Sequence, residues 1–243
     1  MSTPHPTIPD DARIAVVTGG SSGIGEAAAR ALAADGWHVI VAARRLDNLQ
    51  RIADDIGGTA LPLDVTDDAS VAAFAAAVPR VDVLVNNAGG ALGLDSVADA
   101  NLDDWQWMYD TNVLGTLRVT QALLPALHAS GGLVINIGSI AARVPYVGGA
   151  GYNAAKHGVA ALSRVLRLET ADTPLRVCEI DPGRVHTDFS LVRFKGDAAK
   201  ADAVYANKHN LTAEDIAEAI RWVASLPAHV NIDELRIMPV DQV

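Results

Sequence analysis

The 243-residue sequence contains only one cysteine, Cys178, which excludes an internal disulfide and is typical of a reducing compartment. Cys178 lies in an apolar run, so we expect a buried structural thiol rather than a reactive one. Aromatic residues make up only 5% of the chain, although half of it is hydrophobic. A core built mainly from Ala, Val, Ile and Leu favours a parallel sheet covered by helices.

Positive charge and long apolar runs are also scarce. The chain has 19 Lys and Arg against 29 Asp and Glu, and this net charge of -10 gives no support to nucleic-acid binding. No apolar run approaches the roughly 18 residues of a membrane span, and no His, Cys, Asp or Glu cluster has metal-ligand spacing. We therefore expect a cytoplasmic protein without a nucleic-acid partner, a membrane partner or a metal.

Short apolar runs alternate with helical patterns along the chain. The runs predict seven strands, over 13–17, 37–43, 61–63, 81–85, 133–137, 175–180 and 235–238. Strands that alternate with helices form a parallel sheet. We therefore predict an α/β fold: one Rossmann-type, doubly wound domain over 12–243, with helices on both faces of a seven-stranded parallel sheet. Residues 1–11 are polar, contain three prolines and lack an apolar signal core, so we expect a loose leader.

Several helix boundaries are marked in the sequence. Asp67 and Thr212 are expected to cap the helices that follow them. A long helix is predicted over 102–127, with Pro125 ending or kinking it, and another over 150–171. The polar segment 188–210 interrupts the alternation of strands and helices, and we interpret it as a lid over the substrate.

A glycine-rich turn, T-G-G-S-S-G-I-G over 18–25, joins the first predicted strand to a helical pattern. Glycines let the backbone approach a pyrophosphate, and free N–H groups at a helix start favour its negative charge. The second predicted strand ends in Arg44 and Arg45, and position 43 lacks the carboxylate that would accept from a free 2′-hydroxyl. Because arginine pairs with a 2′-phosphate, we predict NADP. The alternative is that Arg44 and Arg45 are solvated residues at the start of a helix.

The next two predicted strands also end in polar or small residues. Asp64 follows the third strand, where its carboxylate could meet the adenine amino group. The sequence N-N-A-G over 86–89 follows the fourth strand and could line a cofactor cleft or simply form a turn.

Ser139, Tyr152 and Lys156 form a second candidate cluster. Ser139 closes the predicted strand 133–137, at the carboxyl edge of the sheet where ligands bind. Tyr152 and Lys156 are four residues apart and therefore share one helix face. A cation within about 4–6 Å lowers the pKa of an acid by about 1–3 units, which would let Tyr152 exchange a proton. The spacing alone is also compatible with an amphipathic helix on which Tyr152 and Lys156 are simply exposed.

These motifs together resemble the short-chain dehydrogenase/reductase family over essentially the whole chain. The match adds P-G-x-V-x-T over 182–187 and Asn112 to the motifs above. The resemblance implies that Tyr152 is the general acid/base, that Lys156 lowers its pKa and holds the nicotinamide ribose, and that Ser139 positions the substrate oxygen. Asn112 would hold a water for proton relay. The implied cofactor residues are Thr18, Gly19, Ser21, Ser22, Gly23, Ile24, Gly25, Arg44, Arg45, Asp64, Val65, Asn86, Ala88, Gly89, Tyr152, Lys156, Pro182, Gly183, Val185 and Thr187.

A narrower likeness is carried by three segments, V-R-F-K-G-D over 192–197, L-P-A-H-V-N-I over 226–232 and M-P-V over 238–240. They resemble the NADP-dependent 3-hydroxy acid (serine/allo-threonine) dehydrogenase subgroup. Ser22 stands where many NADP users have a basic residue, so the two arginines after the second strand would bind the 2′-phosphate. The chain also ends at Val243, before the longer tail of some relatives. The resemblance implies a homotetramer, with a dimer as the alternative.

The expected function is that of an NADP-dependent oxidoreductase that interconverts a secondary alcohol and a carbonyl, acting on a small 3-hydroxy acid. An aldehyde or ketone reductase of secondary metabolism is one alternative, and a non-catalytic dinucleotide-binding regulator is another. A carboxylate substrate needs a cation in the pocket. Arg193, in the predicted lid, is our choice, and Arg143 and Arg184 are the other candidates.

Overall fold

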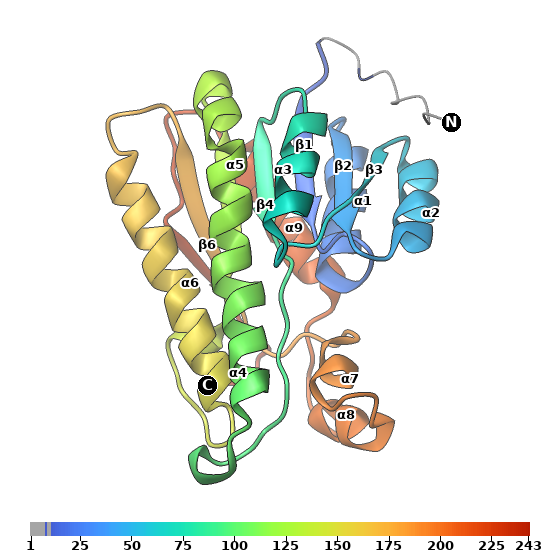
Figure 1. The fold of residues 1–243 in the computed structure, drawn as a ribbon, viewed down its shortest axis with the longest axis vertical. Helices are drawn as coiled ribbons and strands as arrows, with labels where there is room; N and C mark the ends of the chain where they lie inside the picture. Colours follow the sequence, from blue (N-terminus) through green and yellow to red (C-terminus); the bar gives the residue numbers. More distant parts are fainter. Residues whose placement is uncertain (1–7, 9–10) are drawn as a thin grey trace.

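Seven strands form one sheet in the order β3-β2-β1-β4-β5-β6-β7, and every pairing is parallel, as predicted (Figure 1). The computed structural model describes residue 8 and residues 11–243, so the expected leader over 1–11 lies largely outside the described residues. The strands are β1 (Ile14–Thr18), β2 (His38–Ala43), β3 (Thr59–Pro62), β4 (Val83–Asn86), β5 (Leu133–Ile137), β6 (Arg176–Pro182) and β7 (Glu234–Ile237).

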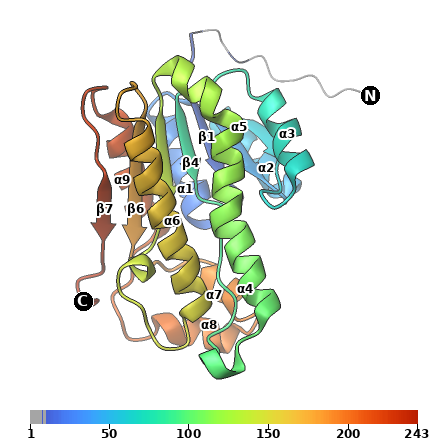
Figure 2. The same ribbon diagram turned by 60° about the vertical axis from the view of Figure 1, so that its left-hand side comes forward.

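Helices cover both faces of the sheet (Figures 1 and 2). One face carries α1 (Gly23–Ala34), α2 (Leu46–Ile56) and α9 (Ala213–Ser225). The other face carries α3 (Asp68–Ala77), α5 (Gly115–Ser130) and α6 (Ala150–Glu169). The predicted caps are confirmed: Asp67 accepts hydrogen bonds from the first turn of α3, and Thr212 forms a capping box with Asp215 at the start of α9.

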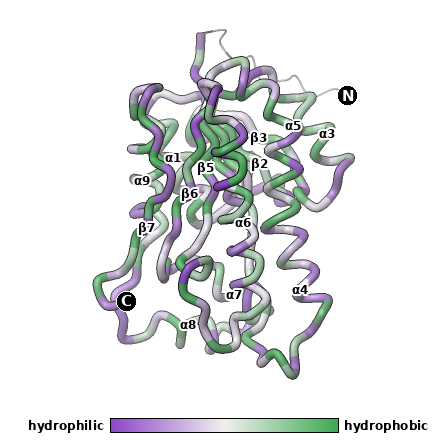
Figure 3. The backbone as a smooth tube through the Cα atoms, turned by 90° about the vertical axis from the view of Figure 1, so that its left-hand side faces the viewer, coloured by the Kyte–Doolittle hydropathy of each residue, from purple (hydrophilic) through white to green (hydrophobic). Residues whose placement is uncertain are grey.

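The core follows the two-residue period of the strands. Val17 and Val41 face the layer of α1, α2 and α9, whereas Val16 and Ile40 face the layer of α3 and α5. All four side chains are fully buried, because a parallel sheet with helices on both faces has no solvated face. Figure 3 shows this distribution as a hydrophobic centre inside more polar helices and loops.

The helix predicted over 102–127 begins at Leu102 as predicted, but it contains a π-helical turn and extends to Ser130, so Pro125 does not end it. It consists of α4 (Leu102–Tyr109), a π-helical turn (Asp110–Leu114) and α5, which contains Pro125 and continues to Ser130. Within the π turn, Asn112 Nδ2 donates to the carbonyl oxygen of Met108 at 2.7 Å, a group that would otherwise accept from a backbone N–H. Such turns occur frequently at functional sites.

The carboxyl ends of the strands point toward the end of the molecule that carries α4, α7 (Phe189–Arg193) and α8 (Ala198–Tyr205) (Figure 2). The last two helices make up most of the segment 188–210. Two short 3₁₀ turns complete the fold, Val97–Asp99 and Ile140–Ala142. Among the helices described, none is long and apolar enough to cross a membrane.

Candidate active site

The glycine turn between β1 and α1 forms a backbone cradle. Gly19 and Gly23 have φ values of +64° and +55°, in the left-handed region that favours glycine. A Cβ atom at Gly25 would lie 2.3 Å from the carbonyl oxygen of Gly19, so a side chain cannot be accommodated there. Ser22, the N-cap residue of α1, makes no side-chain capping bond, which leaves the helix N–H groups available to an anion. This geometry fits a pyrophosphate.

The residues after β4 hold the cradle in shape. Asn87 Nδ2 donates to the carbonyl oxygens of Thr18 and Gly19, at 3.0 and 3.2 Å, and Thr18 Oγ1 accepts from the backbone N–H groups of Asn87 and Ala88. Asn86 points into the protein instead and bonds Thr120 and Asn136. The sequence interpretation assigned the motif over 86–89 to the cofactor as a whole, and in the structure it is Asn87 rather than Asn86 that contacts the cradle.

Of the two arginines after β2, Arg45 contacts the cradle and Arg44 lies near Asp64. Arg45 Nη2 donates to Ser21 Oγ at 3.0 Å and to Ser22 Oγ at 2.8 Å. Burial raises the pKa of Asp64, but hydrogen bonds from Thr66 and the charge of Arg44 outweigh it and the pKa is lowered. Both arginines are exposed.

Other predicted cofactor residues surround the same cradle or support it. Thr187 lies beside Gly23, because a Cβ atom there would be 3.5 Å from Thr187 Cβ. Val185 forms an isolated parallel bridge with Leu211. The remaining predicted residues take supporting positions: Pro182 ends β6, Gly183 packs against Pro239, Ile24 packs against the core, and Val65 packs against Gly115.

Ser139, Tyr152 and Lys156 are brought together where β5 meets α6. All three are buried, at 9%, 9% and 7% exposure. Lys156 Nζ donates to the carbonyl oxygen of Ile137 at 2.8 Å and lies 5.7 Å from the centre of the Tyr152 ring. Ser139 Oγ accepts from the backbone N–H of Ala141 at 3.1 Å and is the side chain that hydrogen-bonds to Tyr152.

The expected lowering of the Tyr152 pKa by Lys156 is wrong in this structure. Burial raises the pKa of Tyr152 above its ordinary value, and the opposing effects of Ser139 and the charge of Arg193 are smaller. Burial also lowers the pKa of Lys156 to about 8. Both shifts have the same cause, since a buried group is less stable in its charged form.

Asn112 ties the π turn to the loop after β4. Its Oδ1 atom accepts from the backbone N–H of Gly90 at 3.2 Å, and Nδ2 donates to the carbonyl oxygen of Gly90 at 2.8 Å. A Cβ atom at Gly89 would lie 2.5 Å from Asn112 Oδ1 and 3.9 Å from Lys156 Nζ. Because Gly89 has no side chain, Asn112 and Lys156 can both lie close to its backbone.

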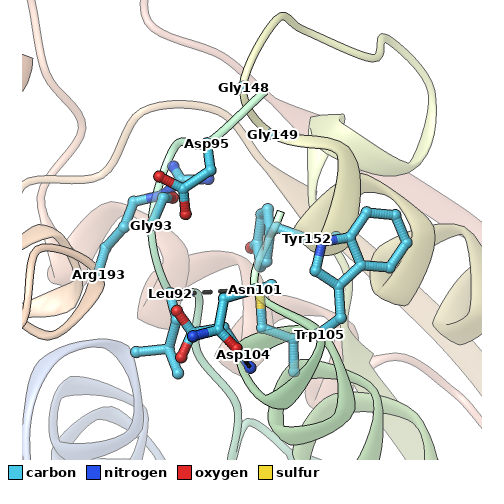
Figure 4. Close-up of a pocket in the computed structure, with 12 residues that line it drawn as sticks. Leu92, Gly93, Asp95, Asn101, Asp104, Trp105, Gly148, Gly149, Tyr152 and Arg193 are labelled. Atoms are coloured by element: carbon cyan, nitrogen blue, oxygen red, sulfur yellow. Dashed lines mark hydrogen bonds between the residues drawn. The ribbon is translucent and has the colours of Figure 1, made fainter. Parts of the chain in front are cut away.

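A small pocket lies beside Tyr152 (Figure 4). Its lining residues are Leu92, Gly93, Asp95, Asn101, Asp104, Trp105, Met108, Gly148, Gly149, Gly151, Tyr152 and Arg193. The volume of about 10 Å³ has room for roughly one water molecule. The sequence prediction missed the wall formed by α4, although Trp105 and Met108 are three residues apart and so share a helix face.

Arg193 closes this pocket from the segment 188–210. Its Nε atom donates to the carbonyl oxygen of Gly93 at 3.1 Å, and the backbone N–H of Gly93 donates back to Arg193 at 2.9 Å. The guanidinium carbon lies 5.4 Å from the ring centres of Tyr146 and Tyr152. A cation of α7 and the phenol of α6 thus face the same space.

The other two candidate arginines are engaged elsewhere. Arg143 pairs with Asp181, Glu179 and Glu234, at 3.1, 3.5 and 2.9 Å. Arg184 pairs with Asp241 at 2.7 Å and also bonds the side chain of Asn210. Neither lines the pocket beside Tyr152.

Comparison with known proteins agrees with this geometry. The family model described as short chain dehydrogenase matches residues 13–197. The chain belongs to the short-chain dehydrogenase family. An uncharacterised oxidoreductase of Mycobacterium tuberculosis is 61% identical over 237 residues, covering 97% of this chain and 94% of that protein. The NADP-dependent 3-hydroxy acid dehydrogenase of Salmonella typhimurium is 46% identical, covering 94% and 96% of the two chains.

Solved structures of this family show the same fold. The closed form of a serine dehydrogenase complexed with NADP⁺ superimposes with a TM-score of 0.92 at 43% identity, over 95% of this chain and 96% of that chain. A serine dehydrogenase from Escherichia coli superimposes with a TM-score of 0.83 at 38% identity, over 95% and 99% of the two chains. As a member of a dehydrogenase family, the protein is an oxidoreductase.

Proposed function

We propose that the protein is an NADP-dependent dehydrogenase that interconverts the secondary alcohol and the carbonyl of a small 3-hydroxy acid. The observation that carries this proposal is the pairing of Tyr152 with Arg193 in one pocket. A phenol can exchange a proton with the substrate oxygen, and a guanidinium can bind a carboxylate a few atoms away. The names of the 3-hydroxy acid and serine dehydrogenase relatives support the same substrate class.

The proposed cofactor would lie across the carboxyl ends of the strands from β2 to β6. The glycine cradle and the start of α1 would bind the pyrophosphate, and Arg44 and Arg45 would bind the 2′-phosphate. Lys156 would hold the ribose of the nicotinamide half, near the loop that contains Thr187. When bound, the nicotinamide supplies or accepts the hydride.

The residues around Tyr152 would manage the proton. Tyr152 donates its phenolic proton to the developing alkoxide in the reductive direction and accepts it in the oxidative one. The hydroxyl of Ser139 positions the same substrate oxygen. Asn112 would hold a water that returns the proton to solvent.

We further propose that the segment 188–210 acts as a lid. Besides the two bonds between Arg193 and Gly93, Lys195 Nζ lies 2.8 Å from Asp104 Oδ2 on α4. These contacts join the segment to two walls of the pocket, whose volume of about 10 Å³ is too small for a 3-hydroxy acid. Substrate entry would therefore require the lid to move away from Gly93 and Asp104.

Replacing Arg193 with Met tests the substrate class. The variant should raise KM for 3-hydroxybutyrate by roughly ten- to a hundredfold, because it removes a charge-assisted bond to the carboxylate. KM for the neutral alcohol 2-butanol should change little. Both are obtained from initial rates of NADPH formation.

Lys195→Met is the matched control, since Lys195 is a cation of the same lid that pairs with Asp104. This control should affect acid and alcohol equally. Equal losses for both substrates in Arg193→Met would show that Arg193 only orders the lid, and the assignment of a carboxylate site would be withdrawn.

We also propose a cytoplasmic homotetramer. Two exposed apolar residues of α6, Val165 and Leu168, and Tyr109 of α4 support pairing of helices between subunits. The edge strand β7 and the exposed Trp222 of α9 would supply further contacts. A buried free thiol at Cys178 is consistent with a reducing compartment.

Light scattering should give a mass about four times the 25.4 kDa of one chain at micromolar concentration. A mass about twice that of one chain would indicate the dimer. A monomer at the same concentration would contradict the proposed assembly.

A further inference from the structure

Two buried acidic side chains lie directly behind Ser139. Glu179 and Asp181 are two residues apart on β6, so both point to the same face of the sheet, and they are 3% and 0% exposed. The backbone N–H of Ser139 donates to Asp181 Oδ1 at 2.9 Å, and Arg143 Nε donates to Asp181 Oδ2 at 3.1 Å. Asp181 therefore fixes the backbone that carries the Ser139 hydroxyl.

Gly138 shows how close the two carboxyl groups are. A Cβ atom at Gly138 would lie 2.1 Å from Asp181 Oδ1 and 2.6 Å from Glu179 Oε1, so the two oxygens lie side by side. Glu179 Oε1 is fully buried and has no hydrogen-bond donor among the described residues, since Arg143 Nη2 is 3.5 Å away. Two ionised carboxylates in this position would repel each other, and one shared proton removes that repulsion.

The arginines nearest to the two carboxyl groups are shared with other carboxylates. The charged groups around Glu179 come from every element packed against it: Arg143 after β5, Lys156, Arg164 and Arg167 on α6, Asp181 on β6, and Asp233 and Glu234 beside or on β7. Asp233 pairs with two of these arginines, and Glu234 pairs with Arg143. Burial, followed by the charge of Asp181, raises the pKa of Glu179 to about 8.

We propose that Glu179 and Asp181 share one proton, and that ionised Asp181 is a positioning residue that holds Ser139 and supports the ammonium of Lys156. Asp181 acts on Ser139 through the backbone N–H, while its charge opposes the loss of the proton from Lys156. The arrangement also explains Gly138, because a side chain there would displace both carboxyl groups. The proposal rests on the proposed function for its turnover test but not for its stability test.

The stability test uses Glu179→Gln. A carboxyl group whose pKa is raised by folding stabilises the protein fully below its unfolded pKa and loses that effect as the pH rises through the folded pKa. In the wild type, the contribution of Glu179 to stability should therefore be lost as the pH rises from about 5 to 8. The variant has no carboxyl group at this position and should not show this loss. The Tm of Glu179→Gln minus that of the wild type should rise by roughly 3 °C for each pH unit in this window.

Glu234→Gln is the matched control. Glu234 also pairs with Arg143, at 2.9 Å, but its side chain is 34% exposed. Its Tm difference from the wild type should stay constant across the same pH range. A constant difference for Glu179→Gln as well would overturn the shared proton.

The turnover test uses Asp181→Asn, which keeps an acceptor oxygen for Ser139 but removes the charge. Its kcat with 3-hydroxybutyrate and NADP⁺ should fall about tenfold, with KM for the cofactor nearly unchanged, because a charged acceptor is replaced by a neutral one. At pH 7, Glu179→Gln should stay within about twofold of the wild-type kcat, since Asp181 remains ionised.

The protonation of Glu179 in the Asp181→Asn background provides a second test of the proposal. In Asp181→Asn, Glu179 should ionise at a lower pH than in the wild type, because the charge of Asp181 is removed while the burial remains. Adding Glu179→Gln to Asp181→Asn should therefore give a Tm difference whose pH dependence is shifted to lower pH. A purely structural role for Asp181 would leave that pH dependence in place. Wild-type turnover in Asp181→Asn would refute the positioning role. If the wild type itself does not oxidise 3-hydroxy acids, the proposed function fails. The Tm comparison would still test whether Glu179 and Asp181 share a proton.

Discussion

Tyr152→Phe should lower the rate of hydride transfer by at least about a hundredfold, the lower end of measured acid–base contributions. The variant keeps the ring, which packs edge-on against Phe189 at 5.4 Å between ring centres, and loses only the phenolic proton. The affinity for NADPH should change little. Single-turnover NADPH oxidation measures the chemical step, and equilibrium titration measures cofactor binding.

Tyr109→Phe is the matched control, because Tyr109 is a half-exposed tyrosine of α4 with no role in the site. Its turnover should match the wild type. Near-normal hydride transfer in Tyr152→Phe would exclude Tyr152 as the general acid/base.

Replacing Arg44 and Arg45 together with Ala should weaken NADPH binding by about ten- to a hundredfold and leave NADH binding almost unchanged. The reason is the loss of the charge-assisted contact with the 2′-phosphate, which is worth roughly 1.5–3 kcal/mol. Loss of the bonds from Arg45 to Ser21 and Ser22 would also loosen the cradle, which adds a smaller effect common to both cofactors. Competition titration of the two reduced cofactors measures the difference.

Arg51→Ala controls for the general loss of positive charge near α2, since Arg51 is 54% exposed and pairs with Glu26 and Asp55. It should leave the preference between the cofactors unchanged. A wild-type preference for NADH would contradict the assignment of both arginines.

Local signals in the sequence were sufficient for most of the fold. The strand over 133–137 was predicted to the residue, because a continuous apolar run is bounded by glycines on both sides. The caps at Asp67 and Thr212 were also recognised, since a side-chain acceptor at an N-cap acts within three residues of itself.

Features that depend on distant contacts were not predictable in this way. The π turn at Asn112 requires the backbone of Gly90, 22 residues away, to accept and donate to one side chain. The raised pKa of Tyr152 reflects burial by the whole pocket, which no spacing reveals. Arg143 was a reasonable substrate candidate by position, but its partners come from β6 and β7.

Initial rates with two substrates and two cofactors test the account most directly. 3-Hydroxybutyrate and 2-butanol differ mainly in the carboxylate, and NADP⁺ and NAD⁺ differ only in the 2′-phosphate. We predict that kcat/KM is highest for 3-hydroxybutyrate with NADP⁺, by at least about tenfold over either single replacement. Equal or higher values for 2-butanol, or for NAD⁺, would contradict an NADP-dependent 3-hydroxy acid dehydrogenase.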